Sequence, residues 1–185
     1  MNFYIADMHF GHKNILTYDN RPFSTTQEMD RALITNWNDV VTDNDTVYVL
    51  GDIFWIAEDA ENIIKRLKGK KVLIIGNHDK IGVYVKANRF VEITQYKELE
   101  MDNTGVILTH FPLAEWDGFY YGTYHLYGHT HSTFNLAEFT LQRERPNGNC
   151  WDVGVDNNNF EPVSFEEIKE KIDKNIKDIT DGKNI

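Results

Sequence analysis

The stretch that decides the fold is residues 71–79, Lys-Val-Leu-Ile-Ile-Gly-Asn-His-Asp. Its apolar run stops abruptly at Gly76, which is typical of a buried strand that ends in a turn. The polar residues Asn77, His78 and Asp79 then follow the carboxyl end of the strand, where ligands gather in open α/β sheets. The segment therefore predicts both a strand and a place for chemistry directly after it.

Four more short runs of β-branched or aromatic residues lead into polar residues in the same way. They cover residues 2–6, 46–50, 105–109 and 124–127, and they run into Asp7, Gly51-Asp52, His110 and Gly128-His129-Thr130-His131. Between the first three strands the pattern predicts helices over residues 26–41 and 58–68, the second closed by Gly69. This alternation indicates βαβ units and a mainly parallel sheet.

The remaining elements carry no chemistry. Residues 90–101 read as one or two strands, followed by a turn at 102–105. Ser164 and Glu167 form a capping box that opens an amphipathic helix. The apolar face of that helix consists of Ile168, Ile172, Ile176 and Ile179.

The composition fits one globular domain over residues 1–185, with no separate cap domain. The chain is 41% hydrophobic and 13% aromatic, which is ample for a core. No apolar run is long enough to cross a bilayer, and the lone Cys150 is compatible with a reducing compartment, so we expect a cytoplasmic protein without membrane contact. The formal net charge of -10 disfavours nonspecific nucleic-acid binding without excluding a nucleic-acid substrate.

The pairs Asp7/His9 and His129/His131 have a spacing that suits metal ligands. If each strand continues through its pair, the two side chains leave the same face roughly 6.6 Å apart along the chain. Oxygen and imidazole ligands without thiolate suit manganese, iron, zinc, cobalt or nickel.

Together these motifs resemble the calcineurin-like metallophosphoesterase superfamily, whose motif order is matched from residue 7 to residue 131. The resemblance implies an α/β protein with a four-layer α/β/β/α sandwich of two mixed sheets flanked by helices. It also implies two divalent metal ions, manganese first among them. In that arrangement one ion is held by Asp7, His9 and His131, the other by Asn77, His110 and His129, and Asp52 bridges the two.

Two cations about 4 Å apart can clamp a phosphoryl group and activate a bridging water as hydroxide. His78, which follows a ligand, suits a general acid for the leaving alcohol, with Asp79 as a candidate carboxylate to orient it. The stretch Ile53-Phe54-Trp55 lacks the aspartate and arginine of the protein-phosphatase branch. Proteins are therefore disfavoured as substrates.

The N-terminal motif is a narrower match. Residues 7–15, Asp-Met-His-Phe-Gly-His-Lys-Asn-Ile, followed by Asn20-Arg21-Pro22-Phe23, resemble a subgroup of small bacterial and phage phosphoesterases. We expect His12 and Arg21 to face the substrate phosphate, because arginine suits a bidentate grip on an oxyanion. The alternative is that Arg21 is a surface residue before a turn proline.

The expected activity is hydrolysis of a phosphomonoester or phosphodiester, with a small nucleotide or cyclic phosphate as the favoured substrate. A nuclease of the same superfamily is one alternative, and it would need a basic approach path. The other is a non-catalytic interaction module on the same fold, against which the intact ligand set argues.

Overall fold

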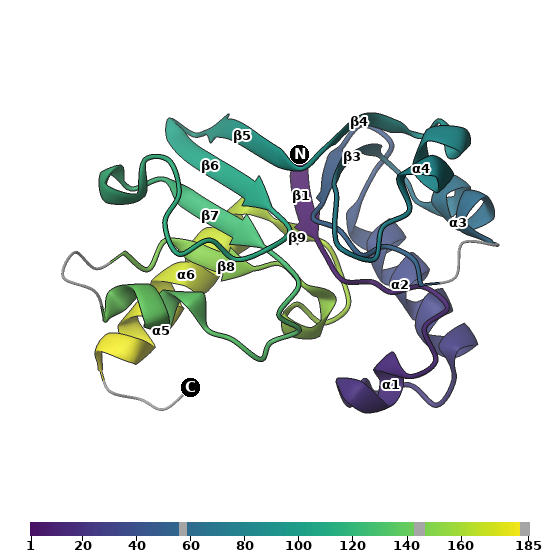
Figure 1. The fold of residues 1–185 in the computed structure, drawn as a ribbon, viewed down its shortest axis with the longest axis horizontal. Coiled ribbons are helices and arrows are strands. Elements are labelled where there is room, and N and C mark those ends of the chain that lie inside the picture. The colour runs from purple at the N-terminus through teal and green to yellow at the C-terminus, as the bar shows by residue number, and fades with distance from the viewer. Residues whose placement is uncertain (56–58, 143–146, 182–185) are drawn as a thin grey trace.

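The computed structural model describes residues 1–55, 59–142 and 147–181. Its strands form two sheets that lie side by side, with helices on the outer faces (Figure 1). The first sheet has the order β4-β3-β2-β1-β9, and the second has the order β5-β6-β7-β8. This is the four-layer α/β architecture that the resemblance implies.

The first sheet is parallel except at one edge. Its four parallel strands are β1 (Asn2–Ile5), β2 (Thr46–Val49), β3 (Lys70–Ile74) and β4 (Phe90–Thr94). The short strand β9 (Val163–Ser164) pairs antiparallel with β1. The predicted mainly parallel sheet is confirmed here.

The second sheet is mixed. Strands β6 (Thr104–Thr109), β7 (Tyr124–Tyr127) and β8 (Cys150–Asp152) are parallel, and β5 (Tyr96–Met101) runs antiparallel to β6. Residues 90–101 therefore form two strands, and only Gln95 separates β4 in one sheet from β5 in the other.

Three apolar clusters hold the layers together. One lies between the first sheet and helices α2 (Thr26–Val40), α3 (Ala60–Arg66) and α4 (Ile81–Ala87). A second joins the two sheets and the buried face of α6 (Phe165–Thr180). The third packs the outer face of the second sheet against α5 (Leu136–Leu141) and the turn η1 (Phe119–Tyr121). Two short turns of helix, α1 (Ile15–Tyr18) and η2 (Val155–Asn157), complete the chain.

The helix predictions hold with shifted ends. The capping box of α6 is formed, since Ser164 and Glu167 bond reciprocally. Helix α3 ends at Arg66 rather than Lys68, and Gly69 lies beyond it in the turn before β3 with a left-handed φ of 81°. The predicted start at residue 58 lies outside the described residues. Within the described ranges, no helix has the length and apolar character needed to cross a membrane.

Candidate metal centre

All seven predicted metal ligands lie at one edge of the two sheets, in loops that leave the carboxyl ends of the strands. Asp7 and His9 follow β1, Asp52 follows β2, and Asn77 follows β3. From the second sheet, His110 follows β6, and His129 and His131 follow β7. The site is thus assembled from both halves of the fold.

Five of these residues have left-handed backbones, which L-residues with side chains rarely adopt. They are Asp7 (φ 58°), His9 (φ 51°), Asp52 (φ 56°), His129 (φ 72°) and His131 (φ 46°). The expectation that the Asp7/His9 and His129/His131 pairs continue an extended strand is wrong, because β1 ends at Ile5 and β7 at Tyr127. Strained conformations of this kind cluster at functional sites, where the surrounding structure holds them in place.

Two glycines of the motifs are required by close approach. A Cβ on Gly76 would lie 2.2 Å from Asp52 Oδ1, and a Cβ on Gly51 would lie 2.5 Å from His110 Nδ1. Gly51 also has a φ of 89°. Because glycine has no side chain at these two positions, the loops after β2, β3 and β6 can meet at one point.

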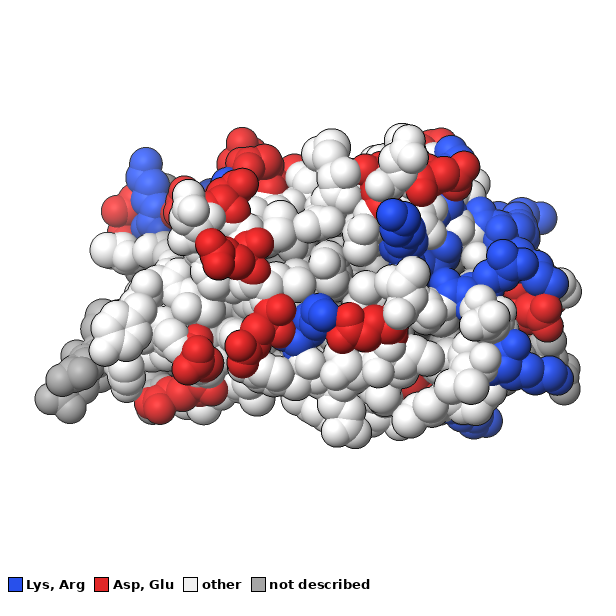
Figure 2. Space-filling model, turned by 90° about the horizontal axis from the view of Figure 1, so that it is seen from above, with Lys and Arg blue, Asp and Glu red and all other residues white. Residues whose placement is uncertain are grey.

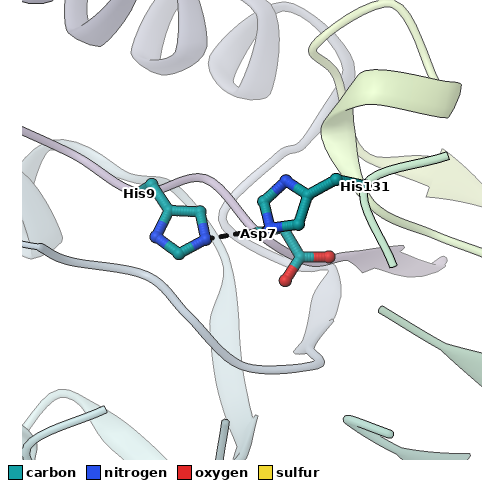
Figure 3. A group of neighbouring side chains, drawn as sticks. All are labelled: Asp7, His9 and His131. Atoms are coloured by element: carbon teal, nitrogen blue, oxygen red, sulfur yellow. Dashed lines mark hydrogen bonds between the residues drawn. The ribbon is translucent and has the colours of Figure 1, made fainter. Parts of the chain in front are cut away.

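The first ligand group consists of Asp7, His9 and His131, whose side chains converge (Figure 3). Their ligand atoms all lie within 4.8 Å of one another, and His9 Nε2 is 3.2 Å from His131 Nε2. Burial, together with the neighbouring His131 and Arg21, lowers the pKa of His9 to about 2. His9 is therefore neutral, as a metal ligand must be.

The second ligand group surrounds Asn77. Its Oδ1 lies 2.8 Å from His110 Nε2 and 3.0 Å from His129 Nδ1. His110 Nδ1 donates to the Leu50 carbonyl at 2.7 Å, since a carbonyl can only accept. With Nδ1 used in this bond, Nε2 is the ring atom that faces Asn77 and the site, a common arrangement for metal-binding histidines.

Backbone N–H groups hold the two carboxylates of the centre in place. Asp52 Oδ1 accepts from the His78 backbone N–H at 2.9 Å, and Asp7 Oδ2 accepts from the His129 backbone N–H at 2.8 Å. The second oxygen of each faces the ligand groups. Asp52 Oδ2 lies 3.8 Å from His9 Nε2 and 3.5 Å from His110 Nε2, so it stands between the two groups.

A buried oxygen without a partner supports a divalent cation at this donor set. Asp7 Oδ1 is buried and has no hydrogen-bond partner. Burial and the charge of Asp152 raise the pKa of the Asp7 carboxyl well above its usual range. A cation at this position would compensate both the unpaired oxygen and the clustered negative charge.

His78 lies at the rim of the centre, and Asp79 does not orient it. The exposed His78 ring is 5.6 Å from the His9 ring. The Asp79 carboxylate instead accepts from the backbone N–H groups of Asp52, Ile53 and Gly76 and from the Tyr84 hydroxyl. The prediction of a catalytic Asp79 is thus corrected: this side chain ties the loops after β2 and β3 together.

Arg21 is buried beneath the centre and does not face solvent. Its side chain is 0% exposed, and its five N–H groups all have partners. Two of them bond to Asp156 at 2.8 Å, and others reach the carbonyl oxygens of Asp7 and Met8. The expectation that Arg21 contacts a substrate phosphate is corrected, because no donor is left for one.

Asp156 and Asp19 are site residues that the sequence analysis missed. The Nδ1 atom of His131 lies 3.1 Å from Asp156 Oδ2 and 2.7 Å from Asp19 Oδ2. The Asp156 carboxylate accepts the hydrogen bond from Nδ1 and turns Nε2 towards His9, and the Asp19 carboxylate adds a nearby negative charge. The sequence did carry a signal for Asp156. The short strand β8 is followed by Gly154 and then by Asp156, much as the other strands are followed by polar residues.

The clustered Asp and His side chains make this edge of the two sheets a candidate metal centre, and comparison with known proteins gives the family of the chain. The model of the calcineurin-like phosphoesterase family matches residues 3–178, so the chain belongs to that family. An uncharacterised protein of Methanocaldococcus jannaschii is 37% identical over 173 residues, covering 92% of this chain and 90% of that protein.

Phage proteins and a solved structure are also similar. The gene 66 protein of Mycobacterium phage L5 is 27% identical over 172 residues, covering 76% of this chain and 82% of that protein. The crystal structure of a protein of unknown function from Aquifex aeolicus matches with a TM-score of 0.72 and 29% identity, covering 92% of this chain and 98% of that one. The expected resemblance to small phage and bacterial proteins is confirmed.

Proposed function

We propose that this chain hydrolyses esters of phosphate with two divalent metal ions, manganese first among the candidates, and that its substrates are small phosphorylated molecules such as nucleotides or cyclic phosphates. The observation that carries the proposal is the position of Asp52 Oδ2 between His9 Nε2 and His110 Nε2. One ion would be held by Asp7, His9 and His131, and the other by Asn77, His110 and His129, with Asp52 shared. Two such cations supply the positive charge that phosphoryl transfer needs.

His78 is the proposed proton donor to the leaving oxygen. Its ring is exposed and lies edge-on to that of His9, so a substrate at the centre can reach it. His12 remains the proposed phosphate contact beside it. His12 is buried, its ring is 5.6 Å from the His9 ring, and its Nδ1 has no partner.

The distribution of charge supports a small substrate. Figure 2 shows Lys and Arg side chains gathered at one end of the molecule, over α3 and α4. The basic residues there include Lys65 and Arg66 in the last turn of α3 and Lys70 at the start of β3. Asn77 follows the opposite end of β3, so Lys70 at the start of that strand lies away from the centre and does not itself supply a path for a nucleic-acid backbone into it.

Side-by-side hydrolysis assays with manganese test the proposal. Bis-p-nitrophenyl phosphate, 2′,3′-cyclic nucleotides and single-stranded DNA are compared, and bound metal is counted in the same samples. We expect turnover of the small substrates and about two metal ions per chain. Exclusive cleavage of DNA would favour the nuclease, and inactivity with less than one ion bound would favour a non-catalytic module.

Two variants separate the roles of ligand and proton donor. Asp52→Asn is expected to abolish metal loading and turnover together, whereas His78→Ala should reduce turnover and leave both ions bound. The exposed Asp43→Asn is the matched control and should change neither. Loss of an ion from His78→Ala would show that the proton-donor assignment is mistaken.

A further inference from the structure

An exposed tryptophan stands next to the proposed proton donor. The Trp55 ring centroid is 5.0 Å from that of His78 and 6.5 Å from that of His9, and the residue is 43% exposed. Single exposed apolar residues are ordinary on a protein surface. An indole beside the reacting groups is different, because a substrate group bound next to His78 can also contact it.

Contacts with His12 and Phe10 fix the orientation of this indole. Its ring stacks on His12 with centroids 3.9 Å apart and an interplanar angle of 10°. The Trp55 backbone N–H donates to the Phe10 carbonyl at 3.0 Å, and Phe10 and Phe54 form a parallel bridge. Since the plane of the ring is set in advance, little conformational entropy would be lost on stacking a ligand against it.

Tyr18 is a second exposed aromatic residue whose ring lies near His12. Its ring lies edge-on to His12 at 6.3 Å, and the residue is 71% exposed. We call the exposed rings of Tyr18 and Trp55 the aromatic shelf, and the buried His12 supports Trp55 beneath it. Trp55 also lines a small hollow with Lys80, which places a cation near the edge of the shelf.

The position of His78 determines which part of a substrate lies on the shelf. Under the proposed function, His78 protonates the leaving oxygen, so the leaving alcohol lies on the side of His78. Trp55 is in ring contact with His78 on that side. A planar leaving group would therefore stack on the shelf while its phosphate occupies the metal centre.

We propose that the aromatic shelf binds the base of a mononucleotide whose nucleoside is the leaving group, and that Trp55 selects substrates with a base over abasic ones. This inference rests on the proposed function. In the reaction, a water oxygen forms a new bond to phosphorus, the bond from phosphorus to the nucleoside oxygen breaks, and the ring proton of His78 passes to that oxygen. The net charge of -10 favours a mononucleotide over a polynucleotide.

The test measures binding separately from turnover. The ligands are phosphonate analogues of adenosine 5′-monophosphate and of ribose 5-phosphate, in which a P–C bond replaces the bond to be cleaved. Their dissociation constants are measured by calorimetry with manganese-loaded protein. Because stacking on an aromatic side chain strengthens binding by about tenfold to a hundredfold per base, we expect the adenosine analogue to bind tighter by that factor.

Variants assign the effect to the shelf. Trp55→Ala should bring the two dissociation constants together by weakening only the adenosine analogue, and Trp55→Phe should keep most of the preference. Phe111→Ala is the matched control, because Phe111 is 48% exposed and its ring lies 4.5 Å from that of His129. The control should keep the full preference.

Three results would overturn the inference: equal binding of both analogues by the unaltered protein, an unchanged preference in Trp55→Ala, or loss of the preference in Phe111→Ala alone. Trp55-dependent binding of single-stranded oligonucleotide without binding of the mononucleotide analogue would also reject it. Hydrolysis of bis-p-nitrophenyl phosphate without a base preference would reject the shelf and leave the proposed function standing. Tighter binding of the adenosine analogue without any hydrolysis would reject the proposed function and leave base binding by the shelf standing.

Discussion

Replacing Arg21 with glutamine is expected to destabilise the metal-free protein. The change removes both bonds to the Asp156 carboxylate, each 2.8 Å long, and the donors to the Asp7 and Met8 carbonyls. Removing one partner of a buried ion pair costs about 3–5 kcal/mol. Asp156 keeps its bond to His131 Nδ1, so we expect the lower end of this range. Against a typical total stability of about 5–15 kcal/mol, this loss is large.

Urea unfolding of the metal-free protein measures the effect as a lower midpoint with an unchanged slope. Arg31→Gln is the control, because Arg31 is exposed on α2 and should unfold at the original midpoint. The double variant Arg21→Gln/Asp156→Asn should lose less stability than the sum of the single changes, since no buried charge is left unpaired. The reasoning fails if Arg21→Gln unfolds at the original midpoint and only weakens phosphate binding, as expected of a residue that grips the substrate.

Three further changes follow from individual contacts. Asp79→Ala should lower the free energy of unfolding by at least about 2 kcal/mol, because three backbone N–H groups lose their acceptor; equal stability with reduced turnover would instead indicate a catalytic role. Gly76→Ala should weaken metal binding by calorimetry, because its Cβ would displace Asp52 Oδ1; unaltered affinity would contradict the close approach. Burial lowers the pKa of Lys71 to about 8, so above that pH the unfolded chain keeps the proton of this residue while the folded chain releases it, and the contribution of Lys71 to stability should rise by about 2 kcal/mol from pH 7 to 9.5. Lys71→Met, followed by thermal unfolding over the same pH range, should remove this rise, and an equal rise in both proteins would refute it.

The sequence predicted which residues gather at the centre but not how the backbone presents them. The Gly-Asn-His-Asp and Gly-His-Thr-His stretches end strands, and the ends of parallel strands meet at one edge of a sheet, so proximity within each sheet followed from local pattern. The two stretches lie in different sheets, and their meeting was expected only from the family resemblance. The left-handed backbone of Asp7 and His9 did not, because an Asp-x-His spacing also fits an extended strand. That geometry depends on backbone bonds from Asp7 and His9 to Gly51 and Asp52, which are distant in sequence.

The role of Arg21 was hidden for a similar reason. Its partner Asp156 lies 135 residues away, and no local pattern links the two. An arginine near a predicted phosphate site reads as a substrate contact until burial shows that its N–H groups are already used. Sequence reasoning was therefore sound for residues that act through strand position and failed where an ion pair joins distant segments.

The passage of the chain from one sheet to the other at Gln95 affects how the centre can form during synthesis. Asp7, His9, Asp52 and Asn77 are made before this crossing, and His110, His129 and His131 after it. Both ligand groups draw on the two sides, so a growing chain has no complete group until His129 has been made, and the group of Asp7, His9 and His131 is complete only two residues later. Metal binding is then a late event that couples the two halves, and the occupied centre would mark a chain whose sheets have already docked.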